Sequence, residues 1–256
     1  MNVYITALLK ILENPEIKGT HYTIAYYLLM HYDEIQNMTL SQLAQECFVS
    51  VSTLKRFFAI YDLHKFTIVK ELLLAHQRVR IAQIEERRDN YRQDQIEATL
   101  HLLLSEEQCQ RILDEKQLKT LIQRISLAHR LIFIGSDEMI NALLRFQADM
   151  ASMGKPVINS SVYPSGYISP ETDDLVFLFS MTGRITQINQ DLAQKIRGLQ
   201  DRMISVGAKD FANGSFMHLY LPENVDDALT YMVMIYYFES IVYLYKETYY
   251  DSRQAL

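Results

Sequence analysis

The chain has 256 residues and a mass of 29.9 kDa. Its hydrophobic fraction of 49% is enough to build one or two cores and excludes a disordered chain. The net charge of −6 excludes a protein coated with nucleic acid, but not one that touches DNA through a small patch. Its only cysteines, Cys47 and Cys109, exclude a disulfide framework and a cysteine-rich zinc site, and free thiols favour a cytoplasmic location.

We expect neither a targeting signal nor a membrane span. The first residues lack a charged leader before an apolar run. The most apolar stretch, 228–244, is shorter than a bilayer span and is interrupted by Thr230, Glu239 and several tyrosines. It therefore predicts a buried or interface helix.

Residues 1–127 are expected to be helical almost throughout, because they contain a single glycine and a single proline. Within them, residues 39–61 predict two short helices joined by a tight turn. Thr39 or Ser41 would cap the first helix and Ser50 the second, since a hydroxyl at that position accepts hydrogen bonds from the first turn.

The second of these helices has two distinct faces. The apolar face carries Leu54, Phe57, Phe58 and Tyr61, and the other face carries Ser52, Thr53, Lys55 and Arg56. Between positions 50 and 92, nine Lys or Arg stand against five Asp or Glu, so that this region is basic in an acidic protein. The pattern is typical of a helix-turn-helix that contacts phosphates and base edges through its cations. The alternative is an ordinary three-helix bundle with a solvated charged face, and the pattern alone favours DNA binding only slightly.

A different pattern begins at Leu131, where short apolar runs alternate with helical stretches. This alternation predicts a parallel α/β sheet. The expected strands are 131–134, 156–158, 175–179, 203–206 and 217–221, and the expected helices are 138–152, 186–199 and 226–249. The polar segment 85–95 is expected to be a linker, either a solvated helix or a flexible hinge.

The loop after the third strand has the composition of a phosphate cradle. Ser180, Thr182 and Gly183 stand between a strand end and a helix start. Amides and hydroxyls at such a position bind anions, and ligands of open α/β sheets lie at the carboxyl ends of the strands. The signal is weak by itself, because small polar residues fill many such turns.

The N-terminal part resembles the helix-turn-helix domain of the RpiR family of bacterial transcription regulators. The resemblance spans about residues 1–75 and rests on Leu43-Ala44, Val49-Ser50, Thr53, Arg56-Phe57, Phe66 and Lys70. The family usually has glycine in the turn and after the second helix, where this chain has Phe48 and Asp62. We therefore expect a turn made without the permissive φ of glycine.

Residues 95–250 resemble the SIS (sugar isomerase) domain, which usually follows this helix-turn-helix. The matching segments are 128–135, 153–157 and 173–183. The two domains in this order imply a regulator that binds double-stranded operator DNA as a homodimer or higher homo-oligomer and has a sugar-phosphate effector. For DNA the implicated residues are Ser50, Ser52, Thr53, Lys55 and Arg56, and for the ligand they are Gly135, Ser136, Ser180, Thr182, Gly183 and Thr186.

The first phosphate loop of the SIS family, G-x-G-x-S, is matched only at its start. Asp137 and Met139 replace its second glycine and its serine, so that Asp137 and Glu138 stand where a phosphate would bind and would repel it. Two interpretations stay open. Either the domain only dimerises, which is slightly favoured for phosphosugars, or it binds a less anionic ligand; Arg184, Lys155 or a partner subunit could supply compensating charge.

No catalytic residue, metal site or cofactor is expected. An SIS-type isomerase needs a positioned base, and the candidates Glu138, His218 and Glu239 have no convincing constellation around them. His218 fits a structural role better, and the seven histidines show no metal-ligand spacing.

The sequence therefore predicts an all-α helix-turn-helix domain at 1–78, a linker at 79–95 and an SIS-like α/β three-layer sandwich with a parallel sheet at 96–256. The expected function is transcription regulation of sugar or amino-sugar genes, with effector binding moving the DNA-binding helices through the hinge. The alternative is a phosphosugar isomerase or phosphosugar-binding protein with a vestigial helical arm.

Overall fold

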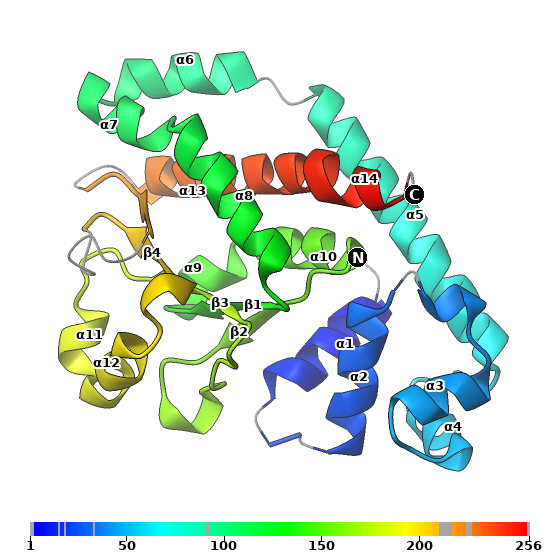
Figure 1. Ribbon diagram of the computed structural model, residues 1–256. Helices are drawn as coiled ribbons and strands as arrows, with labels where there is room; N and C mark the ends of the chain where they lie inside the picture. Colours follow the sequence, from blue (N-terminus) through cyan, green and yellow to red (C-terminus); the bar gives the residue numbers. More distant parts are fainter. Residues whose placement is uncertain are drawn as a thin grey trace.

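The computed structural model describes residues 3–14, 16–17, 19–32, 34–90, 93–209, 217–223 and 227–254 (Figure 1). The N-terminal part is helical, as expected. Its elements are α1 (Val3–Glu13), α2 (Thr20–Met30), the 3₁₀ turn η1 (Glu34–Asn37), α3 (Leu40–Glu46), α4 (Val51–Ala59) and the long helix α5 (Phe66–Asn90).

Three further helices precede the sheet, namely α6 (Gln93–Leu103), α7 (Glu106–Ile112) and α8 (Glu115–Leu127). The sheet has five parallel strands in the order β2-β1-β3-β4-β5. They are β1 (Leu131–Ile134), β2 (Val157–Ser160), β3 (Leu175–Phe179), β4 (Met203–Gly207) and β5 (Met217–Tyr220). A helical region followed by a parallel α/β sandwich is confirmed. The strand order reverses between β1 and β3, where open α/β sheets form their ligand crevice.

The helices after β1 and β3 are more broken than expected. The expected helix 138–152 is two helices, α9 (Asp137–Asn141) and α10 (Leu144–Ser152), and the expected helix 186–199 is α11 (Ile185–Ile188) and α12 (Gln190–Arg197). Short turns η2 (Pro164–Gly166) and η3 (Gln200–Arg202) follow β2 and precede β4. The chain ends in α13 (Asp227–Tyr245), the π-helical turn η4 (Lys246–Tyr250) and α14 (Asp251–Gln254).

One face of the sheet is covered by α10 and α13. Phe133 of β1 contacts Phe146 of α10 and Phe238 of α13, with ring centroids 5.7 and 5.6 Å apart. Phe177 and Phe179 of β3 also pack against Phe238. Offset and edge-to-face aromatic pairs of this kind add to the apolar area that they bury, so α13 is part of the core.

The opposite face of the sheet is covered by the N-terminal helices. Its side chains belong to the same core as α1 and α2; they are Ile132, Ile134, Ile158, Val176 and Leu178. The connection 161–174 between β2 and β3 holds only η2 and no crossover helix. We conclude that α1 and α2, together with α12, form the third layer (Figure 1).

The polar segment 85–95 is helical up to Asn90, where α5 ends. Ile84, just before it, is fully buried, and Tyr91 and Arg92 lie outside the described residues. The apolar C-terminal stretch Ala228–Arg253 is long and apolar enough to cross a membrane, but two thirds of its most apolar window is buried, as in the core helix of a globular protein.

Candidate functional site

The helix pair α3–α4 begins each helix with a hydroxyl cap. Thr39 accepts a hydrogen bond from the amide of Gln42, and the side chain of Gln42 accepts one from the amide of Thr39 at 2.8 Å, which completes a capping box. Ser50 caps α4 by accepting from the amide of Thr53 at 3.1 Å. The predicted caps at positions 39 and 50 are present, and they fix where each short helix starts.

The turn between α3 and α4 differs from our expectation. Phe48 has a φ of 54° and Asp62, which follows α4, has a φ of 59°. Both occupy the left-handed position after a helix. The amide of the following residue bonds back to a carbonyl of the last turn, Val49 to Ala44 at 2.9 Å and Leu63 to Phe58 at 3.0 Å. The backbone thus keeps the conformation that glycine permits, and the two side chains carry its steric cost.

The exposed face of α4 carries the residues predicted for DNA. The hydroxyl of Ser50 lies 2.7 Å from that of Ser52 and 2.8 Å from that of Thr53, so these three residues form one hydroxyl cluster. Lys55 and Arg56 are exposed, and neither forms an ion pair within the described parts of the chain. The apolar residues of α4 point inward, as predicted, with Leu54, Phe57 and Phe58 buried.

The residues predicted for ligand binding meet at the carboxyl ends of β1 and β3. These strands are paired, and Gly135 after β1 lies against the backbone of Phe179 at the end of β3. A Cβ added to Gly135 would lie 2.6 Å from the Cβ of Phe179, and one on Gly207 would lie 2.0 Å from the carbonyl oxygen of Ser180. Only glycine allows so close an approach of these loops.

Polar groups at this edge differ in exposure. Ser136 and Thr182 are exposed, whereas Ser180 is buried and its amide donates to the carbonyl of Val206 at 2.9 Å. Gly183 has a φ of 70°, which turns the loop toward α11. Thr186 follows as the second residue of α11. The structure thus brings both predicted loops together at the carboxyl ends of β1 and β3, with the exposed hydroxyls of Ser136 and Thr182 on them.

The charge at this edge is mixed. Asp137 and Glu138 are exposed in the first turn of α9, and Arg184 is exposed in the loop after β3. Lys155 cannot compensate the carboxylates, because it precedes β2 and so lies at the opposite end of the sheet. Its ammonium is buried and donates to the carbonyls of Ala128 and Ser126, and burial lowers the pKa of Lys155 to about 8.

The three candidate bases occupy different surroundings. Glu138 is exposed at the ligand edge, and Nδ1 of His218 on β5 lies 2.8 Å from the hydroxyl of Ser205. Glu239 on α13 is buried and accepts from the hydroxyl of Tyr243 at 2.6 Å. No cluster of His, Cys, Asp or Glu that could hold a metal ion occurs among the residues that the structure describes.

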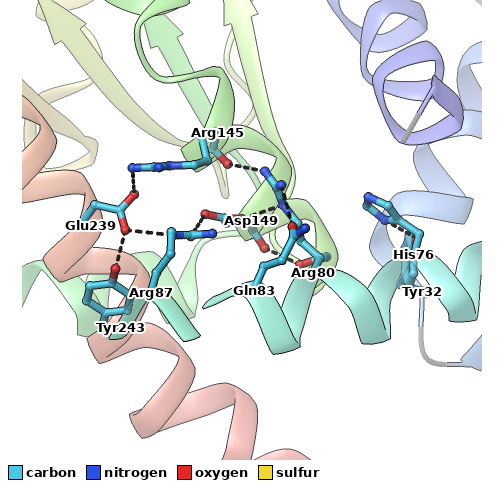
Figure 2. A network of polar contacts seen from close by, with 10 residues as sticks. Tyr32, His76, Arg80, Gln83, Arg87, Arg145, Asp149, Glu239 and Tyr243 are labelled. Carbon is cyan, nitrogen blue, oxygen red and sulfur yellow. Dashed lines mark hydrogen bonds and ion pairs between the residues drawn. The ribbon is translucent and has the colours of Figure 1, made fainter. Parts of the chain in front are cut away.

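A buried charge network joins α5 to the sandwich (Figure 2). Asp149 of α10 is 0% exposed and is held by two arginines of α5: Arg80, whose Nε lies 2.7 Å from Oδ1, and Arg87. Arg87 also reaches Glu239 at 3.4 Å, and Arg145 closes the network with Glu239 at 2.5 Å. Burial raises the pKa of Asp149, and the two guanidinium groups oppose that shift.

This network was not predicted from the sequence. Arg80 and Arg87 are seven residues apart and therefore share one face of a helix, which is a detectable signal. Their partner Asp149 lies 62 or more residues further along the chain and carries no local mark of its role. The network anchors α5, which follows the α3–α4 pair, to α10, which follows the first candidate ligand loop.

The structure defines a class of protein, a helical region packed on a parallel α/β sandwich with its candidate ligand edge at the switch in strand order. No protein-family model and no curated protein sequence matches the chain. Among solved structures, the NanR protein of Vibrio vulnificus, complexed with ManNAc-6P, is similar over 97% of this chain and 94% of that chain, at 15% identity and a TM-score of 0.45.

A hypothetical protein from Methanococcus jannaschii, with an inferred function of 3-hexulose-6-phosphate isomerase, is similar over 65% of this chain and 93% of that chain. The identity is 16% and the TM-score 0.44.

Proposed function

We propose that this protein is a cytoplasmic bacterial transcription regulator of the RpiR type, which binds double-stranded operator DNA through α4 as a homodimer. The observation that carries the proposal is the outer face of α4, where a capped hydroxyl cluster adjoins Lys55 and Arg56. Short hydroxyls let a helix enter the major groove, and cations contact phosphates or guanine edges. The basic surroundings of this helix in an acidic chain support the same assignment.

We propose no enzymatic step. A phosphosugar isomerase would need a base at the ligand edge. Glu239 is occupied by Arg145 and Tyr243, and His218 is bonded to Ser205. Glu138 does lie at that edge, but it is exposed to solvent beside Asp137 and forms no ion pair within the described part of the chain. The surroundings of these three candidates favour a regulator over the isomerase alternative.

We further propose that the edge formed by Ser136, Ser180 and Thr182 binds a small effector of the sugar or amino-sugar type. The exposed carboxylates of Asp137 and Glu138 favour a ligand with less negative charge than a phosphosugar. Effector binding would then act on DNA binding through α10 and the charge network that anchors α5, instead of through a flexible hinge at 85–95.

DNA binding is tested with the full chain. Wild-type protein should select a duplex motif from a random library, and its affinity should fall as salt rises, because phosphate contacts release counterions. Lys55→Ala and Arg56→Ala should each cost about 1–3 kcal/mol of binding free energy if they contact base edges. The control is Lys116→Ala with Lys119→Ala on α8, which removes two exposed cations elsewhere. If the substitutions on α4 and those on α8 lowered the affinity for DNA equally, a specific contact through α4 would be contradicted.

Effector binding is tested by thermal unfolding with a panel of sugar phosphates, amino sugars and inorganic phosphate. A ligand that binds only the folded state raises the midpoint as its concentration rises. A shift with neutral or amino sugars supports the proposed ligand class, and a shift only with phosphosugars contradicts it. If no compound shifted the midpoint, the proposed effector site would be contradicted, and the interpretation that the sandwich only dimerises would be favoured.

A further inference from the structure

Phe48 bears two energetic costs at one position. Its backbone has a φ of 54°, in the left-handed region that favours glycine, and its side chain is 94% exposed. A bulky residue in this region costs about 1–2 kcal/mol relative to glycine. A glycine here would avoid both the strain and the exposed ring, so the folded chain alone gives no reason for a phenylalanine.

Asp62 occupies the equivalent position after α4 and provides an internal comparison. It has nearly the same φ, 59°, but its carboxylate lies 3.0 Å from Nε2 of His64. Aspartate tolerates the left-handed region because it can bond locally. Phe48 makes no ring contact within the described residues, so its strain is not offset in the same way.

We infer that the ring of Phe48 contacts the operator, against a thymine 5-methyl group next to the base pairs that α4 binds, and so helps to determine sequence specificity. This inference rests on the proposed DNA-binding function. Strained residues concentrate at functional sites, and an aromatic ring against a thymine methyl is an established apolar base contact.

The position of Phe48 in the chain places its ring within reach of such a contact. It stands three residues before Val51, the first residue of α4, so that the two Cα atoms are at most about 11 Å apart. That distance corresponds to about three base-pair steps. Gln45, Glu46 and Ser50, close to Phe48 in the chain, are exposed and polar, as suits a surface that meets DNA.

The test begins with motif selection from a random duplex library by the full-length wild type and by Phe48→Gly. Asp62→Gly is the control, because it relieves the same left-handed backbone conformation after α4 instead of after α3. We expect the wild type and Asp62→Gly to select one motif, and Phe48→Gly to lose preference for thymine at one or two flanking positions. Its thermal midpoint should be no lower than that of the wild type, which separates lost contact from lost folding.

The affinity measurement then replaces those thymines by deoxyuridine, which removes only the methyl group. The wild type should lose about fourfold in affinity per lost methyl contact, and Phe48→Gly should lose nothing further. An unchanged motif and affinity in Phe48→Gly would overturn the inference while leaving the proposed function intact, and a change in oligomeric state alone would assign the ring to a contact between copies. If the wild type selects no motif, the proposed function itself fails.

Discussion

His76 on α5 lies where the N-terminal helices meet the sandwich, and its Nδ1 is 3.2 Å from the hydroxyl of Tyr32. Burial, together with the nearby Arg80, lowers the pKa of His76 to about 4. The folded protein therefore keeps the ring neutral at pH values where the unfolded chain takes up a proton. The stability that this contributes is fully present above pH 6.5 and is lost as the pH falls toward 4.

We expect the free energy of unfolding to fall by about 1–2 kcal/mol across that window because of His76, after allowance for its partial exposure to solvent. Urea unfolding at pH 7, 5.5 and 4.5 measures the loss. In His76→Gln this component should vanish, whereas other titrating groups remain, so the difference between the two proteins isolates it. A difference that does not change with pH would refute the prediction.

Gly135 tests how tightly the two candidate ligand loops are packed. A methyl group there would meet Phe179 at 2.6 Å, so Gly135→Ala should lower stability by about 1–3 kcal/mol through overpacking. Gly198→Ala is the matched control, since its Cβ would have an ordinary contact at 3.5 Å and its φ is −79°. Thermal unfolding should separate the two, and equal midpoints would show that the loops can move apart.

At the scale of elements, α5 connects the α3–α4 pair, which we propose binds DNA, to the sandwich. The carboxylate of Asp149 is fully buried between Arg80 and Arg87 of this helix. Removing one partner of a buried ion pair leaves an unpaired charge, so Asp149→Ala should cost about 3–5 kcal/mol of stability. Denaturant unfolding measures this loss.

The control for that substitution is the exposed pair of α5, in which Arg88 lies 3.2 Å from Glu247. Solvent screens such a pair, and Arg88→Ala should cost at most about 1 kcal/mol. If Asp149→Ala proved as mild as Arg88→Ala, α5 would not be anchored by the network, and the route proposed for effector signalling would lose its structural basis.

The elements that the sequence predicted well are those with local causes. β1 and β3 have the bounds of the apolar runs that predicted them. A strand that is buried on both faces is apolar at every position, so its sequence marks both of its ends. Ser50 caps α4 as predicted, since a cap depends only on the next turn. The break at residues 142–143 could not be predicted, because no proline or glycine marks it. The break at Asn189 was missed although asparagine is a preferred cap, and here its side chain accepts from the amide of Leu192.

The sites show the same division. The loops at Gly135 and Ser180 could be placed together because parallel neighbouring strands end at one edge. The position of Lys155 at the other edge follows from the same topology, but only once the strand order is known. The left-handed φ of Phe48 was not predicted, because a bulky side chain disfavours that conformation. The backbone at the end of α3 adopts it nevertheless.

At the scale of the whole molecule, the N-terminal helices and the sandwich share a hydrophobic core. The sheet face with Ile132, Ile158 and Val176 packs against α1 and α2, and the connection between β2 and β3 supplies no helix in their place. Polar contacts reinforce this packing: the carboxylate of Glu13 accepts from Gln147 at 2.5 Å, and Arg130 donates to the hydroxyl of Tyr22 at 2.5 Å. Movement of the N-terminal helices as a free unit would expose that face to water.

From this packing we expect that residues 96–256, the expected bounds of the sandwich, do not fold stably without the N-terminal helices. A chain of residues 96–256 would expose one apolar face of the sheet, for which hydrophobic burial is the main driving force. We expect it to bind a hydrophobic dye, to aggregate and to unfold without a cooperative transition, whereas the full chain unfolds cooperatively. Adding residues 1–95 in trans should suppress dye binding if α1 and α2 cover that face. A fragment 96–256 that unfolds cooperatively, stays monomeric and binds no dye would show that α1 and α2 are dispensable for the sandwich, and the N-terminal helices could then move away from it.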